Sequence, residues 1–138
     1  MSKKIEDIIE SQNWTNWIKF PFPQDFGWEK GSNKNNLRQI LRKILSKPYS
    51  IGVYQLRNIK TNENILFGIT TTQTLEIRMS SLLPSYSGGR GGRNNTNKIK
   101  YVNNNVNHIE FRVLYSSKSK TKIIEDYLKL LKNHRFNT

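Results

Sequence analysis

The chain has 138 residues, enough for one hydrophobic core, so a single compact domain with an N-terminal extension is expected. Lysine and arginine number 23 against 10 acidic residues, which gives a formal net charge of +13 and predicts a polyanionic partner. Cysteine is absent, which excludes disulfides and thiolate zinc sites, and no run of residues approaches the roughly 18 apolar residues that a membrane-spanning helix needs.

The first 49 residues are predicted to form a helical and aromatic-rich extension. Apolar residues at helical spacing predict helices over residues 3–12 and 35–47. Between them prolines forbid a regular helix, and the segment is rich in aromatic residues: Trp14, Trp17, Phe20, Phe22, Phe26 and Trp28. These rings either stack on bases or belong to an irregular arm that buries them against the core, and we favour burial.

From residue 50 onward the pattern predicts strands followed by helices. Two apolar runs, 51–56 and 64–70, are separated by a polar connection and predict a β-hairpin. Apolar spacing predicts a short helix over residues 74–83. Residues 97–106 are ambiguous between a weak helix and an irregular segment, because asparagine favours turns.

A third strand over residues 109–115 and a helix over residues 118–132 complete the predicted domain, which spans residues 50–138. The expected fold class is α+β, with a small three-stranded mixed or antiparallel sheet flanked by helices.

The segment that joins the predicted short helix to residues 97–106 is rich in glycine and contains Arg90 and Arg93. Glycine allows the backbone to approach a phosphate closely, and arginine binds phosphate or guanine through two parallel hydrogen bonds. The alternative is an ordinary surface loop, and RNA would suit such a loop as well as DNA. The residues predicted to bind nucleic acid are Arg38, Arg42, Arg90, Arg93, Lys98 and Lys100.

Several short motifs follow one another in a specific order along residues 50–138. Gly52-Val53-Tyr54 lies in the first predicted strand and Leu66-Phe67-Gly68 in the second. Arg78 falls on the following helix, and Glu125 precedes Asn137 in the closing segment. This order resembles the GIY-YIG nuclease superfamily, and the closing segment is similar to that of the excinuclease members of this superfamily. Leu66 stands where the tyrosine of the YIG half belongs.

The resemblance implies a role for each of these residues. Glu125 would hold one divalent cation, expected to be Mg²⁺, because a lone carboxylate with waters and phosphate oxygens suits its octahedral shell. Arg78 would contact the scissile phosphate, and Tyr54 would orient or deprotonate the attacking water. Asn137 would fix the local geometry through hydrogen bonds.

The function that follows is that of a cytoplasmic, metal-dependent DNA endonuclease of restriction, mobile-element or phage type, without a membrane partner. Double-stranded DNA is the expected substrate, and a homodimer would match a palindromic site. Two alternatives stay open. One is a catalytically inactive DNA- or RNA-binding protein on the same fold, for which Leu66 is the best argument, and the other is an RNA-associated basic protein.

Overall fold

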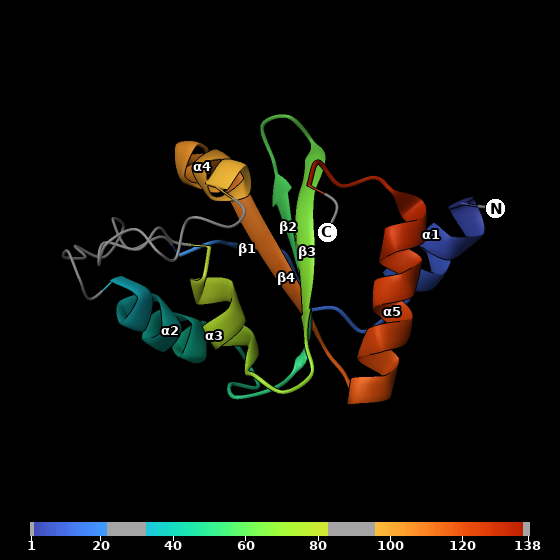
Figure 1. Cartoon of the computed structure of the whole chain (residues 1–138), viewed down its shortest axis with the longest axis horizontal. Coiled ribbons are helices and arrows are strands. Elements are labelled where there is room, and N and C mark those ends of the chain that lie inside the picture. Colours follow the sequence, from blue (N-terminus) through green and yellow to red (C-terminus); the bar gives the residue numbers. More distant parts are fainter. Residues whose placement is uncertain (1, 22–32, 83–95, 137–138) are drawn as a thin grey trace.

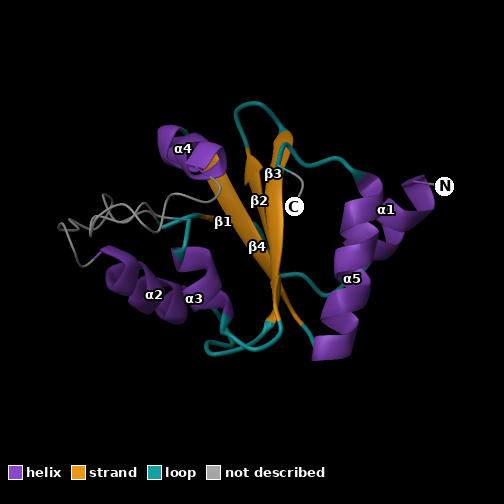
Figure 2. Cartoon of the chain, viewed as in Figure 1, coloured by secondary structure: helices purple, strands orange, loops and turns teal. Residues whose placement is uncertain are grey.

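The computed structural model describes residues 2–21, 33–82 and 96–136. In this part of the chain an antiparallel sheet of four strands, in the order β1-β4-β2-β3, is covered by helices on both faces (Figures 1 and 2), so the fold is α+β. None of the described helices is both long and apolar enough to cross a membrane.

The strands are β1 (Ile18–Lys19), β2 (Gly52–Asn58), β3 (Glu63–Thr70) and β4 (Ile109–Tyr115). The predicted hairpin is confirmed as the β2–β3 pair, and β4 pairs with the other side of β2. The expectation of three strands is wrong, because β1 adds a fourth strand beside β4. A strand of two residues is too short to leave a periodic pattern in the sequence.

Five α-helices and a 3₁₀ turn are present among the described residues: α1 (Ser2–Glu10), α2 (Asn33–Ile44), α3 (Leu75–Ser80), α4 (Thr96–Asn104), η3 (Val106–His108) and α5 (Lys118–Leu131). Hydroxyl caps fix two of the helix starts, since Thr74 Oγ1 accepts from the Ile77 amide and Ser117 Oγ accepts from the Lys120 amide. Residues 97–106, which the sequence left ambiguous, are mostly helical, because α4 covers most of this segment.

The sheet separates two hydrophobic cores. Figure 1 shows α2, α3 and α4 on one face and α1 and α5 on the other. On the first face Tyr54 and Leu56 of β2 pack with Leu37 and Leu41 of α2 and with Met79 of α3. The smaller core on the second face consists of Ile9, Val53, Phe67, Leu114, Ile124 and Leu128. Alternate residues of β2 thus serve opposite cores.

The described part of the aromatic segment packs inward. Phe20 is fully buried, with its ring edge against Phe111 at a centroid distance of 5.6 Å. Trp14 and Trp17 are half-buried, and the guanidinium of Arg112 lies over both rings, 4.1 Å and 4.7 Å from their centroids. The burial interpretation is confirmed for Phe20, whereas Phe22, Phe26 and Trp28 lie outside the described residues.

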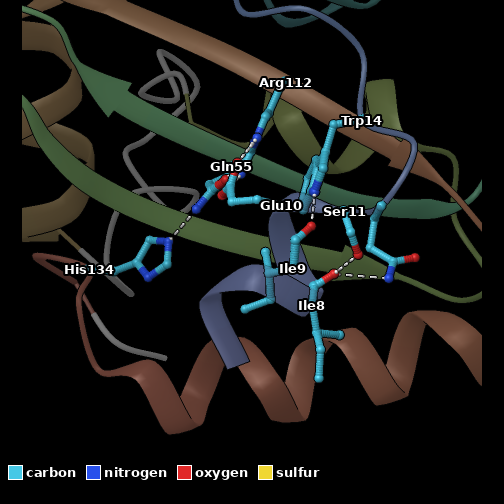
Figure 3. Close-up of polar contacts among 9 residues, drawn as sticks. Ile8, Ile9, Glu10, Ser11, Trp14, Gln55, Arg112 and His134 are labelled. Carbon is cyan, nitrogen blue, oxygen red and sulfur yellow. Dashed lines mark hydrogen bonds and ion pairs between the residues drawn. The ribbon is translucent and has the colours of Figure 1, made fainter. Parts of the chain in front are cut away.

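A partly buried chain of hydrogen bonds crosses the second face of the sheet (Figure 3). Arg112 donates two bonds to the Glu10 carboxylate, at 2.9 Å and 2.7 Å, and a third to Gln55 Oε1 at 2.8 Å. The Gln55 amide nitrogen in turn donates to His134 Nε2 at 2.9 Å, so the imidazole acts as an acceptor and is neutral. The chain links α1, both central strands and the C-terminal tail.

The C-terminal tail lies against the outer edge of β3. The amides of Arg135 and Phe136 donate to the carbonyls of Asn64 and Ile65, at 2.9 Å and 2.8 Å. Arg135 also forms an ion pair with Glu63, at 3.3 Å. The described part of the tail therefore lies at the start of β3, away from its Thr70 end.

Candidate active site

The register of the hairpin places Tyr54 directly opposite Gly68. The tyrosine ring lies across this glycine, since a Cβ on Gly68 would stand 2.3 Å from both Cζ and Oη of Tyr54. No side chain can occupy position 68 while the ring keeps this place, because real Cβ atoms do not come within 3.0 Å of other atoms. The glycine of the second motif thus determines how the tyrosine of the first one lies.

Tyr54 is buried, with 6% of its surface exposed, and it lies close to a positive charge. Burial raises the pKa of Tyr54 to about 12, and the Arg78 guanidinium acts in the opposite direction. The phenol is therefore neutral near pH 7 in the protein as it stands. It can donate and accept hydrogen bonds, and it would need a further positive charge nearby to act as a base.

Arg78 and Glu125 line one open cavity of about 360 Å³ at the Thr70 end of β3. Arg78 is exposed on α3, which covers the first face of the sheet, and Glu125 is half-buried on α5, which covers the second. The cavity therefore lies at β3, the edge strand of the sheet, and is lined by one residue from each of the two helical layers. Two residues far apart in sequence are brought together here.

The Glu125 carboxylate has one ion-pair partner among the described residues, Lys129 of the same helix, at 3.6 Å between Oε2 and Nζ. Exposed pairs of this kind contribute little to stability, so the carboxylate is not committed to a structural role. The described residues contain no group of three or more histidine, cysteine, aspartate or glutamate side chains arranged to hold a metal ion. The other cavity-lining side chains with oxygen atoms are Thr70, Thr71, Thr72 and Gln73.

Lys98 of α4 is half-buried and lies near Arg78. Burial lowers the pKa of Lys98, and the positive charge of Arg78 lowers it further. Arg78 thus lies near both Tyr54 and Lys98, and the two cations would favour an anion between them. Lys100 is exposed on the same helix.

The two predicted nucleic-acid-binding arginines of α2 make contacts with α3. Arg38 donates to Ser80 Oγ at 2.9 Å, and Arg42 donates to the buried carboxylate of Glu76 at 3.3 Å. Arg42 also stacks on the ring of Tyr49, 4.7 Å from the ring centroid. Both side chains therefore join the two helices, and their binding to nucleic acid stays a prediction.

Three further predicted site residues, Arg90, Arg93 and Asn137, lie outside the described residues. Leu66, which stands in place of the second motif tyrosine, is buried in the first core. The sequence also offers Tyr86, Tyr101 and Tyr115 as substitute hydroxyls, of which Tyr86 lies outside the described residues. Tyr101 is bonded to Glu63 and Asn58, at the opposite end of the hairpin from the cavity, and the Tyr115 hydroxyl accepts from the Lys47 amide.

The sequence-based prediction missed the segment Thr70–Gln73, which lines the cavity between β3 and α3. Its signal was a run of hydroxyl and amide residues directly after a predicted strand, where ligand-contacting loops are common. Comparison of the chain with protein-family models, with curated proteins and with solved structures finds no match.

Proposed function

We propose that this chain is a metal-dependent DNA endonuclease of the GIY-YIG type, which hydrolyses phosphodiester bonds. The observation that carries the proposal is that Arg78 and Glu125, singled out by the order of short motifs, line the same cavity. Tyr54, the third residue of that set, lies close enough to Arg78 for the charge to act on its pKa. A net charge of +13 supports a polyanionic substrate.

In the proposed reaction Arg78 binds the scissile phosphate and stabilises the negative charge that develops on it. Its exposure at the cavity leaves it accessible to a large substrate. Lys98 lies on the same side and adds positive charge behind Arg78. Since a buried ammonium group is costly to keep charged, a phosphate between the two cations would restore the pKa of Lys98 toward its ordinary range.

Glu125 is the residue that would hold the divalent cation. The cavity combines this carboxylate with threonine and glutamine oxygens, a donor set of the hard oxygen type that Mg²⁺ prefers. When bound there, the cation would supply charge stabilisation for the leaving oxygen. Water and phosphate oxygens would complete its shell.

Tyr54 is proposed to orient the attacking water through its hydroxyl. Its pKa of about 12 argues against a phenolate at neutral pH in the protein alone. A second positive charge at the cavity would act in the same direction as Arg78 and lower this pKa, so proton removal by Tyr54 would require the assembled complex.

A second candidate is a DNA- or RNA-binding protein without catalytic activity. Leu66 favours it, because this buried leucine supplies no hydroxyl where the family places its second tyrosine. The same basic surface would then serve binding alone.

The decisive experiment is to incubate the purified protein with supercoiled and linear double-stranded DNA in magnesium, with EDTA as the metal-free control. The variants are Glu125→Gln, which keeps the shape but removes the charge, and Glu6→Gln, a matched change at an exposed carboxylate of α1. Discrete fragments that are lost with EDTA and with Glu125→Gln, but kept with Glu6→Gln, support the proposal. Binding without cleavage over several metals and substrates leaves the second candidate.

A further inference from the structure

Three lysines and Glu125 share one side of α5. Lys118, Lys122, Glu125 and Lys129 are separated by four, three and four residues, the spacing that places side chains above one another on a helix. All three lysines are exposed. We name Lys118, Lys122 and Lys129 the α5 lysine ridge.

The α5 lysine ridge passes along the cavity. Glu125 lies within the row and lines the cavity with Arg78, and helical spacing places Lys122 and Lys129 about one turn to either side of it. At a rise of about 1.5 Å per residue, the ridge extends about 16 Å along α5. The basic residues Arg78 and Lys98 lie on the other helical layer, so positive charge borders the cavity from both sides.

The side of α5 that faces the sheet lies about a third of a turn from the ridge. Thr121, Ile124 and Leu128 are buried, and the two apolar residues among them belong to the second core. A helix that binds in the plane of a membrane inserts its apolar face between the lipids. In α5 that face already packs on the sheet, and the exposed apolar residues Ile123 and Leu130 lie outside the ridge, so the ridge itself is a row of charges suited to a phosphate backbone.

We infer that the α5 lysine ridge contacts the phosphate backbone of a DNA duplex and seats one strand beside the cavity. The inference rests on the proposed function and adds a binding surface to it. A length of about 16 Å corresponds to about five phosphates of one strand, at about 3.4 Å of helix axis per phosphate. The ridge offers charges and no aromatic ring, whereas surfaces for single strands combine charge with stacking on rings.

The test compares two charge-matched double variants. Lys118→Gln with Lys122→Gln removes two ridge lysines and leaves Lys129, which pairs with Glu125, in place. Lys120→Gln with Lys60→Gln removes two exposed lysines elsewhere, one off the ridge on the same helix and one in the β2–β3 turn. Affinity for a fluorescent duplex is measured in EDTA as a function of salt concentration.

We expect the slope of log affinity against log salt to become less negative by about 1.8 in the ridge variant, at about 0.9 for each lost phosphate contact, and to stay near that of the parent in the control variant. Equal slopes for the two variants overturn the inference. So does a ridge variant that keeps its duplex slope but loses binding to phosphatidylserine vesicles.

Cleavage in magnesium is scored separately with the same proteins. A parent that never cleaves, together with a ridge variant whose salt slope is less negative, refutes the nuclease and supports the ridge. A parent that cleaves while both variants share one slope refutes the ridge and leaves the nuclease.

Discussion

Replacing Gly68 by alanine tests whether this glycine determines the position of Tyr54. The added Cβ would lie 2.3 Å from Cζ and Oη and 2.6 Å from Cε1 of the tyrosine, so the ring or the strand has to move. The ring is buried in the first core and has little room. Overpacking of this kind costs about 1–3 kcal/mol, which for a domain of this size lowers the melting temperature by about 3–10 °C.

A double-mutant cycle with Tyr54→Leu isolates the clash. Leucine lacks the outer ring atoms that the new Cβ would meet, so Gly68→Ala is expected to cost at least about 1 kcal/mol less in the Tyr54→Leu background. Urea unfolding of the parent, both single variants and the double variant gives the coupling energy. If the two substitutions are additive, the cost at position 68 comes from the strand backbone and not from the ring, and the reasoning fails.

The remaining predictions concern a hydroxyl, a glycine and two ionisable groups. Tyr54→Phe should keep the melting temperature and reduce the rate of DNA cleavage about 100-fold or more, as measured by the disappearance of supercoiled plasmid. Gly52→Ala should lower the free energy of unfolding by about 2–4 kcal/mol, because φ is +152° and the new Cβ would meet the Leu114 carbonyl. An unchanged midpoint in urea titrations would show that the strand adapts to the new side chain. Burial lowers the pKa of His134 to about 4, so as the pH falls the unfolded chain takes up the proton before the folded one. The free energy of unfolding of the parent should therefore fall by about 3 kcal/mol between pH 7 and pH 4. Urea titrations at the two pH values should show that His134→Gln lacks this loss. The hydrogen bonds from Arg112 hold the pKa of Glu10 below its usual value. The shift stabilises the fold at pH values above the unfolded pKa, and this stabilisation is lost as the pH falls through the folded pKa. In Glu10→Gln the melting temperature should therefore fall less steeply with decreasing pH than in the parent.

The elements with clear periodicity were predictable from the sequence. The apolar runs of β2 and β3, the alternation along β4 and the apolar positions of α5 predicted those elements nearly to the residue, because their patterns reflect packing against the cores. Strand β1 could not be predicted, because its position depends on pairing with Phe111 and Glu110 and not on its own two residues. Tertiary packing likewise made α4 a helix despite its asparagines.

The candidate site was predictable only in part. The order of motifs singled out Arg78 and Glu125, but nothing local in the sequence indicates that residues of helices on opposite faces of a sheet line one cavity. The buried contacts of Arg112 were also missed, because an arginine in a strand is expected at the surface. Its partners Glu10, Gln55 and the tryptophan rings come from three separate segments.

The short pairings at the two borders of the sheet bear on how the protein behaves at high concentration. A free border strand offers unpaired amides and carbonyls to another molecule, and this is a common route to aggregation. Here β1 covers the outer side of β4, and the tail after α5 covers β3 at Asn64 and Ile65. The tail pairs with the end of β3 away from Thr70. It therefore occupies part of the edge of β3 and leaves the approach to the cavity open. A deletion that removes residues 134–138 should therefore promote self-association before it alters the cavity.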